Sequence, residues 1–476
     1  MKNPQVVSSD SLRTQFVAAM SAMYRSEVPQ YESLVDLVEQ VNEQELLNNP
    51  TLEQSLRHSN SLERMAEERH GAIRLGKAEE LFNVRRLFAL LGMQPVGYYD
   101  LAVAGIPVHS TAFRPVQSSA LAVNAFRVFT SLLRTDLIED QDLRQRAEAV
   151  LSSRHIFSPQ LLQLMDEAEQ NGGITADQSA TFIELAVGIF RWQDEALVDT
   201  ELYQQLHDSH RLIADVVSFK GPHINHLTPT TVNIDRVQTL MPEKGITPKA
   251  VIEGPPRRNC PILLRQTSFK ALQEPVKFAN QQGDFEVGSH TARFGEIEQR
   301  GIALTEKGQA LYNQLLNKVR EQITPNPDGS NAAEYSAVLE SVFSAFPDSY
   351  CELREQQLAF FNYSVRQDAI VDVAANQDKT IEELIGLNLV RFDPVIYEDF
   401  LPVSAAGIFQ SNLGDTANNA TAGATSNQSL FESQLGAQVS DYFALYEQQQ
   451  QVSIDNCLSA FQQVKSAAQQ SLAKAV

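Results

Sequence analysis

The spacing of apolar residues divides the chain into a mainly helical first part and a later part rich in short strands. From the N-terminus to about residue 215, apolar residues recur every three or four positions, as Leu81, Val84 and Phe88 illustrate. This spacing predicts amphipathic helices. Residues 92–115 carry prolines and glycines that interrupt the pattern, so a loop followed by a strand is expected there.

The pattern changes between about residues 216 and 300, where short runs of Val, Ile, Phe and Thr are separated by turn-forming residues. These runs predict the strands of a sheet. A helix should follow, because Leu311, Leu315 and Val319 would share one helical face. A second strand-like segment, residues 388–409, is then expected to rejoin the sheet.

These patterns together predict an α+β protein that folds as one integrated unit. Three parts are expected: a mainly helical part at 1–215, a β-rich core at 216–412 with a helical insertion at about 305–375, and a low-complexity insertion with a C-terminal helical segment at 413–476. Residues 415–428 and the glutamine run at 448–451 are low in large apolar residues and suggest a mobile insertion beside helical segments. No function is assigned to it.

The charge balance narrows the class of partner. The formal net charge is -21, with 38 Lys and Arg against 59 Asp and Glu. A polyanion would be repelled unless basic residues gathered in one patch, and the sequence shows no such cluster. The composition therefore argues against nucleic acid as a partner.

The number of cysteines and the lengths of the apolar runs indicate the cellular compartment. Cys260, Cys351 and Cys457 are odd in number and widely spaced, which fits a reducing environment better than a disulfide framework. No apolar run approaches the ~18 residues that cross a bilayer. We expect a cytoplasmic protein without a membrane partner, and its oligomeric state is not predicted.

The first candidate for chemistry is the pair His70 and Arg74. Asn60 and Glu63 form a candidate capping box, and on a helix His70 and Arg74 would share a face because they are four residues apart. An imidazole beside a permanent cation suits a metal that binds an anionic substrate. A buried structural histidine beside a surface arginine remains the alternative.

The second candidate is the histidine pair of the segment GPHINHLTP. On a helix, His223 and His226 could meet one metal, but the following residues 228–234 favour a strand. Residues three apart on a strand face opposite sides. One histidine would then be a ligand, and the other would be structural or support the ligand.

The third candidate is an alternating segment in which Phe294, Glu296 and Glu298 would lie on one face of a strand. Inward carboxylates need a partner such as a metal. Two alternatives remain open: a solvated ladder of Glu296, Glu298 and Arg300, or His290 as a competing ligand.

Two histidines and one carboxylate from separate segments make the set that holds Fe(II) with three positions open. A 2-oxo acid can chelate at two of them, and dioxygen can take the third. Zinc accepts the same ligands, so a hydrolase or an isomerase is not excluded by the residues.

Four segments in one order, ERHGAIRLG, GPHINHLTP, HTARFGEIEQRG and YEDFLPVSAAGIFQSN, resemble the bacterial and plant 2-oxoadipate dioxygenase/decarboxylase family. The resemblance implies Fe(2+) bound by His70, His226 and Glu296. It implies Arg74 as the substrate-binding and catalytic arginine, and Val403 and Ser404 as further substrate contacts, through a backbone N–H and a hydroxyl.

A more distant resemblance concerns FGEIEQRG, which is similar to the segment that carries the metal glutamate in hydroxyphenylpyruvate dioxygenase and hydroxymandelate synthase. It favours Glu296 over Glu298. It also implies the vicinal oxygen chelate architecture, in which a curved mixed sheet surrounds the metal, here with many added helices.

The activity implied by the family is oxidation of 2-oxoadipate by O2 to 2-hydroxyglutarate and carbon dioxide in lysine breakdown, through ferryl-mediated intramolecular hydroxylation. The expected partners are thus a small 2-oxo acid and dioxygen. The alternatives are a divalent-metal lyase or isomerase on the same scaffold and a non-enzymatic helical interaction protein.

Overall fold

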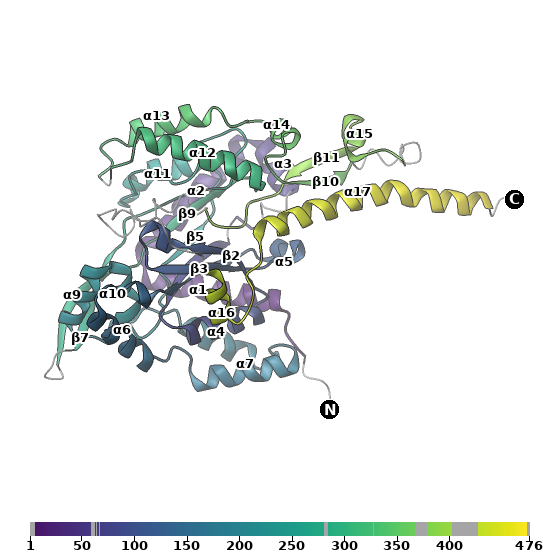
Figure 1. The fold of residues 1–476 in the computed structure, drawn as a ribbon. Coiled ribbons are helices and arrows are strands. Elements are labelled where there is room, and N and C mark those ends of the chain that lie inside the picture. The colour runs from purple at the N-terminus through teal and green to yellow at the C-terminus, as the bar shows by residue number, and fades with distance from the viewer. Residues whose placement is uncertain are drawn as a thin grey trace.

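Helices surround mixed β-structure in this protein (Figure 1). The computed structural model describes residues 5–58, 62, 64–65, 67–279, 284–326, 328–366, 378–401 and 427–473. The α+β class predicted from the apolar pattern is confirmed. The division into three parts at residues 215 and 412 stays a prediction.

The largest sheet has the strand order β2-β3-β4-β1-β5. Its strands are β1 (Glu68–Leu75), β2 (Gln94–Asp100), β3 (Val108–Arg114), β4 (Arg127–Leu133) and β5 (His226–Pro229). Strand β1 runs parallel to β4 and antiparallel to β5, so it is paired on both edges. Four of these strands lie in the part expected to be mainly helical, and that expectation was therefore incomplete. Strands β1, β3 and β4 are paired on both edges and buried along almost their whole length, so they have no clear alternation of apolar and polar residues.

A two-stranded sheet of β6 (Leu264–Ser268) and β9 (Glu296–Arg300) lies beside β5. The backbones of Thr230 and Glu298 form a parallel bridge just beyond β5. Strands β1, β5 and β9 thereby come together, although more than 220 residues separate β1 from β9 in sequence. This arrangement positions the site described below.

Two further pairs of strands stand apart from the largest sheet. Strands β7 (Gln273–Ala279) and β8 (Phe285–Thr291) form a hairpin, and β10 (Phe361–Val365) pairs with β11 (Val390–Pro394). The segment 388–409 was expected to rejoin the main sheet, and this is wrong for its described strand. Strand β11 finds its hydrogen-bond partners in β10 instead.

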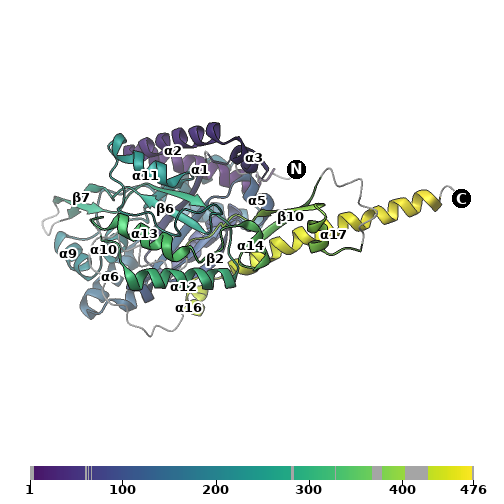
Figure 2. The ribbon, with the colours of Figure 1, turned by 90° about the horizontal axis from the view of Figure 1, so that it is seen from above.

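The helices cover the strands on several sides (Figures 1 and 2). They are α1 (Ser9–Glu27), α2 (Pro29–Asn48), α3 (Pro50–His58), α4 (Ala78–Leu90), α5 (Ser118–Val123), α6 (Gln141–Ser153), α7 (Pro159–Asn171), α8 (Ser179–Gly188), α9 (Thr200–Ser209), α10 (Arg211–Ser218), α11 (Ile234–Leu240), α12 (Glu306–Gln322), α13 (Ala332–Phe343), α14 (Tyr350–Glu355), α15 (Ile381–Gly386), α16 (Gln428–Leu435) and α17 (Tyr442–Ala473).

Two helices predicted from apolar spacing are confirmed. Helix α4 buries Leu81, Val84 and Phe88 on one face and packs against β1 and β2. Helix α12 buries Leu315 and Val319. Burial of each such side chain removes apolar area from water and contributes roughly 1.5–3 kcal/mol to folding.

The C-terminal helix α17 extends beyond the rest of the molecule (Figures 1 and 2). The glutamine run at 448–451, expected to be a mobile insertion, lies in this helix. Its side chains have a structural role, because Gln450 Oε1 accepts a hydrogen bond of 2.8 Å from the backbone N–H of Phe361 on β10. Residues 402–426, which include Val403 and Ser404, lie outside the described residues.

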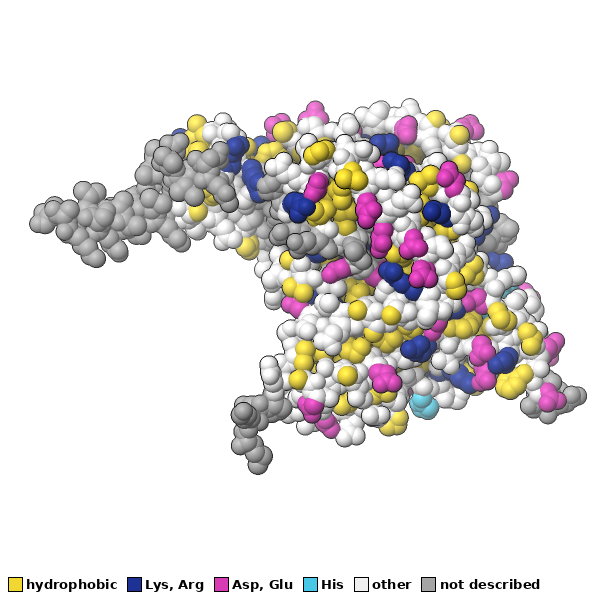
Figure 3. All heavy atoms as spheres, turned by 180° about the vertical axis from the view of Figure 1, so that it is seen from behind, with side chains coloured by type: hydrophobic (Ala, Val, Ile, Leu, Met, Phe, Trp, Pro, Cys, Tyr) yellow, Lys and Arg dark blue, Asp and Glu magenta, His cyan; other side chains and the backbone are white. Residues whose placement is uncertain are grey.

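One face of the molecule shows no basic cluster, as the sequence predicted. On the face shown in Figure 3, basic and acidic side chains are interspersed and do not form separate patches. None of the described helices is long and apolar enough to span a bilayer.

Candidate metal centre

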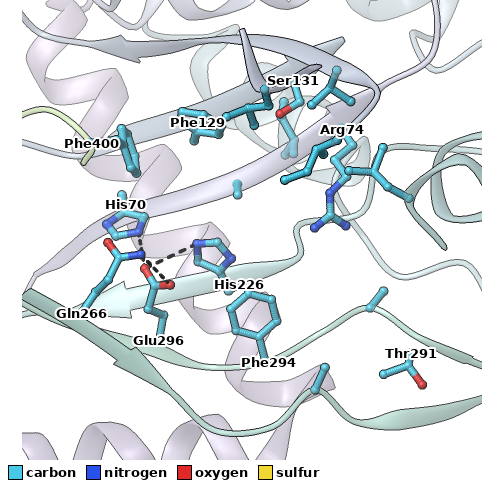
Figure 4. Close-up of a pocket in the computed structure, with 18 residues that line it drawn as sticks. His70, Arg74, Phe129, Ser131, His226, Gln266, Thr291, Phe294, Glu296 and Phe400 are labelled. Carbon is cyan, nitrogen blue, oxygen red and sulfur yellow. Dashed lines mark hydrogen bonds and ion pairs between the residues drawn. The ribbon is translucent and has the colours of Figure 1, made fainter. Parts of the chain in front are cut away.

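The three predicted ligands meet where β1, β5 and β9 come together. His70 lies on β1, His226 begins β5 and Glu296 begins β9. One potential ligand atom from each of the three lies within 4.8 Å of the others, and Figure 4 shows their side chains pointing toward one another. Tertiary structure thus unites residues from three distant segments.

Strand geometry, and not helix geometry, places His70 and Arg74 on one face. The helix expected for this segment is wrong, because Glu68–Leu75 is strand β1 and its backbone bonds to both β4 and β5. Residues four apart also share a face on a strand, whose side chains alternate with period two. The expected shared face is therefore confirmed for a different reason, but the two side chains are not adjacent, because four residues of a strand span about 13 Å. The candidate capping box at Asn60 and Glu63 lies outside the described residues.

Glu296 has the environment of a metal-binding carboxylate. Its side chain is buried, and Oε1 lies 2.8 Å from Nε2 of His70 and 3.8 Å from Nε2 of His226. Burial raises its pKa, but the two histidines outweigh burial and lower the pKa to about 2. The carboxylate is therefore ionised, as a ligand must be.

His226 presents a neutral imidazole. Burial lowers its pKa to about 3, and its ring stacks on Phe294 with the centroids 4.6 Å apart. Its Nδ1 is buried without a hydrogen-bond partner among the described residues. A neutral imidazole is the form that binds a metal.

Glu298 bonds to the ring nitrogen of His70 that faces away from Glu296. Its Oε2 lies 2.7 Å from Nδ1 of His70, on the opposite side of the ring from Glu296. Glu298 is fully buried and also pairs with Arg300 and Arg69. The solvated charge ladder considered for this strand is wrong. Instead, Glu298 orients His70, as carboxylates commonly do behind metal-binding histidines.

His70 therefore lies between two carboxylates. Burial lowers its pKa, but the hydrogen bonds to Glu296 and Glu298 outweigh burial and raise it. His70 and Glu296 are two of the residues that would hold a divalent cation here. The donor set thus fits a divalent metal: two nitrogens and one oxygen, with the net charge of a single carboxylate.

His223 and His290 do not join this centre. They meet instead at Asp215 on α10, where Nε2 of His290 lies 2.9 Å and Nε2 of His223 lies 3.2 Å from Asp215 Oδ1. The two histidines of GPHINHLTP thus have different surroundings, as expected, but not through alternation along a strand, because β5 begins at His226 and His223 lies in the loop before it. His290 is not a ligand of the candidate centre.

Arg74 lies at the other end of the same pocket. Its side chain is 18% exposed, and Figure 4 shows its guanidinium group turned toward the pocket between Ser131 and His226. Nη1 donates a hydrogen bond of 2.5 Å to Oδ2 of Asp215. Burial raises the pKa of Asp215, but the charges of Arg74 and His223 outweigh burial and hold the pKa well below the ordinary carboxyl range.

The remaining walls of the pocket are largely apolar. They include Leu101, Ile106, Val108, Phe129, Leu212 and Phe400. Such walls exclude water and strengthen the interactions of the few charged groups inside. The pocket thus has the candidate metal ligands at one end and a guanidinium group at the other, within a largely apolar lining.

Several residues of the site had no signal in the sequence pattern. Gln266 on β6 points its Nε2 toward Glu296 Oε2 at 3.4 Å, and Thr228 Oγ1 lies 3.1 Å from His70 Nε2. Asp215 was also missed. A buried aspartate within an otherwise apolar helix face would have been the one usable indication.

Known proteins resemble this chain in both sequence and fold. Residues 16–412 match the family described as 2-oxoadipate dioxygenase/decarboxylase. The chain is 54% identical over 457 residues to the 2-oxoadipate dioxygenase/decarboxylase of Pseudomonas putida, covering 95% of this chain and 97% of that protein. It is 51% identical over 452 residues to the Escherichia coli protein of the same name, covering 95% and 98%.

A solved structure agrees over almost the whole chain. The crystal structure of the hydroxyglutarate synthase from Pseudomonas putida in complex with 2-oxoadipate superposes with a TM-score of 0.88. Sequence identity is 53%, and the match covers 96% of this chain and 99% of that one.

Proposed function

The chain belongs to the 2-oxoadipate dioxygenase/decarboxylase family, and from this premise we propose that it oxidises 2-oxoadipate with dioxygen to 2-hydroxyglutarate and carbon dioxide. Membership of this family makes it an enzyme. The alternative of a non-enzymatic interaction protein is therefore set aside.

One observation carries the assignment to a 2-oxo diacid: the metal ligands and Arg74 occupy opposite ends of one pocket. His70 and Arg74 are four residues apart on β1, about 13 Å along the strand at the usual rise. Their side chains reach into the pocket from these two points (Figure 4). A dicarboxylate can bind at both ends at once, whereas a monocarboxylate can bind at only one of them.

We propose Fe(II) as the metal, held by His70, His226 and Glu296. The buried, ionised carboxylate and the buried neutral imidazole support this set, as does the match of three ligands to iron oxygenase sites. When bound, the iron supplies open positions at which a 2-oxo acid chelates and dioxygen is reduced.

The overall reaction balances without a second substrate. The bond between C1 and C2 of 2-oxoadipate breaks and C1 leaves as carbon dioxide, while C2 becomes a carboxylate. The carbon beside that new carboxylate gains a hydroxyl group. Oxidative decarboxylation supplies two electrons and hydroxylation supplies two more, which together reduce one O2. One oxygen atom enters the carboxylate and the other enters the hydroxyl group.

The protein's own groups orient the substrate and exclude water. Arg74 is proposed to bind the carboxylate remote from the metal, since its planar fork matches a carboxylate in a closed pocket. Val403 and Ser404 are kept as proposed contacts to the same carboxylate. Phe129 and Phe400 would shield the carbon chain between the two ends.

We propose a vicinal oxygen chelate architecture, supported by the way β1, β5 and β9 surround the ligands. We place the reaction in lysine breakdown, as the family resemblance implied. We propose a cytoplasmic location, supported by the described cysteines, all three of which are free thiols.

The deciding experiment is an oxygen-electrode trace of the Fe(II)-loaded protein with 2-oxo acids of increasing length, followed by product analysis. We expect one O2 consumed and one CO2 released per 2-oxoadipate, with 2-hydroxyglutarate as the product. Equal turnover under strict anaerobiosis would overturn the dioxygenase and favour a metal lyase or isomerase.

A further inference from the structure

A chain of hydrogen bonds behind Arg74 leads away from the pocket. Arg74 donates through Nη1 to Oδ2 of Asp215. The other oxygen of Asp215, Oδ1, lies 2.9 Å from Nε2 of His290. Nδ1 of His290 lies 2.8 Å from the hydroxyl of Tyr203. No other hydrogen-bond partner of Arg74 is found in the described part of the chain.

The direction of these bonds follows from the groups themselves. An ionised carboxylate can only accept, so Arg74 and His290 both donate to Asp215. The two ring nitrogens of His290 bond in opposite directions, Nε2 to the Asp215 carboxylate and Nδ1 to the Tyr203 hydroxyl. Every member therefore has a matched partner, and the orientation of one group determines that of the next.

The members come from elements that hold them rigidly. Asp215 lies on α10, His290 on β8 and Tyr203 on α9, and all three side chains are buried. The ring of Tyr203 also packs on Phe278 of β7 at 4.8 Å between centroids. Arg74 is thus the one member whose end group enters the pocket, and the others lie behind it.

This arrangement determines where the guanidinium group stands. A free arginine side chain has several rotatable bonds and could reach carboxylates at different distances from the metal ligands. Bonding to Asp215 through Nη1 removes this freedom and leaves the remaining N–H groups for an incoming carboxylate. A guanidinium group held at one distance matches one length of carbon chain.

We propose that Asp215, oriented by His290 and Tyr203, is a positioning residue that holds Arg74 at the distance matching a six-carbon 2-oxo diacid. The enzyme thereby discriminates against the five-carbon and seven-carbon homologues. This inference rests on the proposed function, because it requires Arg74 to bind the remote carboxylate of the substrate.

The same cluster could be interpreted as a second cation site, since Asp215, His223 and His290 have ligand atoms within 4.8 Å of one another. The existing bonds argue against a metal. Asp215 already has a cation in Arg74, and both nitrogens of His290 are engaged. Metal analysis separates the two interpretations: two metal ions per wild-type chain, falling to one in His223→Ala, would overturn the positioning role.

The test compares kcat/KM for 2-oxoglutarate, 2-oxoadipate and 2-oxopimelate in the wild type and in Asp215→Asn. The asparagine keeps the size of the side chain and loses its charge. We expect the preference for 2-oxoadipate over both homologues to fall at least tenfold, with KM affected more than kcat. If Asp215 only neutralised Arg74, all three substrates would change in parallel, and an unchanged preference would overturn the proposal.

Two further variants complete the design. Tyr203→Phe removes only the last hydrogen bond of the chain and should also lower the preference for 2-oxoadipate, but by a smaller factor than Asp215→Asn. This variant provides the test if Asp215→Asn does not fold.

Glu80→Gln is the matched control. Glu80 forms a buried pair with Arg154, with bonds of 2.6 and 2.8 Å, outside this pocket. The Glu80→Gln enzyme should prefer 2-oxoadipate over its homologues as strongly as the wild type does. If Glu80→Gln lost this preference as much as Asp215→Asn, the proposal would be overturned.

The outcomes also separate this inference from the proposed function. A wild-type enzyme that consumes no dioxygen with any of the three acids would overturn both. A wild type selective for 2-oxoadipate whose preference survives in Asp215→Asn and Tyr203→Phe would overturn the positioning role alone.

Discussion

His70 and Glu298 lie 2.7 Å apart through Nδ1 and Oε2, on the side of the imidazole that faces away from Glu296. The two glutamates of β9 therefore contact the same ring from opposite sides, although only Ile297 separates them in sequence. Glu296 belongs to the candidate metal-binding group with His70 and His226, whereas Glu298 bonds to the other nitrogen of the His70 ring.

Glu296→Gln and Glu298→Gln should consequently differ in metal binding. We expect Glu296→Gln to abolish stoichiometric binding, because a charged ligand is lost. Glu298→Gln should weaken binding by about 10–100-fold, the usual effect of losing the carboxylate behind a metal-binding histidine. Titration of the apo-proteins with Fe(II) or Co(II) measures both. The reverse ranking would assign the ligand to Glu298.

Removal of the imidazole should separate metal binding from folding. His70→Ala is expected to lose stoichiometric metal while it keeps the wild-type circular dichroism spectrum, since β1 is held by backbone bonds to β4 and β5. Elemental analysis of the purified variant checks the first part. Full metal occupancy in a folded variant would show that the metal binds elsewhere.

Arg74→Ala should lower activity toward substrates that carry a remote carboxylate and leave other 2-oxo acids little affected. Truncating one partner of a buried charge pair costs about 2–5 kcal/mol, so kcat/KM for 2-oxoadipate should fall roughly 30-fold or more. 2-Oxohexanoate has the same chain length but no remote carboxylate, and its low turnover should change little. Steady-state oxygen consumption with both acids is the measurement. An equal loss for both would indicate damage at the metal end of the pocket.

Gly71 tests the close packing of β1 against the segment that carries His226. A Cβ atom there would lie 2.6 Å from Ile224 Cδ1 and 3.2 Å from the carbonyl oxygen of His226. We expect Gly71→Ala to lower the free energy of unfolding by about 1–3 kcal/mol, as overpacking does. Gly188→Ala is the control, because a Cβ atom on that α8 glycine meets nothing within 4 Å. Urea unfolding of both variants compares them, and equal stabilities would contradict the packing argument.

Stability should also depend on pH through His109. This buried side chain of β3 has its pKa lowered to about 4 by burial and by the charge of Arg134. The unfolded chain takes up the proton near pH 6.5, so the unfolded state binds more protons between pH 6.5 and 4. The free energy of unfolding should therefore fall as the pH decreases across this window, by at most about 1.4 kcal/mol per pH unit from this group.

The variant His109→Phe removes that titration and keeps a ring against Phe431, which His109 contacts at 4.7 Å between centroids. Its unfolding free energy should change less between pH 6.5 and 4 than that of the wild type. Urea titrations at both pH values give the two slopes, and identical slopes would exclude His109 as the source.

The spacing of apolar residues along the chain was sufficient to predict single helices and strands, because their formation depends on residues close together in sequence. The apolar spacing of Leu81, Val84 and Phe88 predicted α4, and the alternation around Glu296 predicted β9. The shared face of His70 and Arg74 was also predicted, although from a helix, because residues four apart share a face in either geometry. The family resemblance predicted the three ligands, where spacing alone left alternatives open for each.

Long-range contacts decided the rest. Whether Glu298 or Glu296 faces the metal position depends on where β1 lies relative to β9, which no local pattern encodes. The same holds for Asp215, whose role exists only because α10 and β8 place it and His290 behind Arg74. The sequence by itself determined the fold class, the family and the kinds of side chain that could bind a metal. The pairing of β1 with both β4 and β5, and the approach of β9, decided which of those side chains meet, because hydrogen bonds between distant segments set their positions.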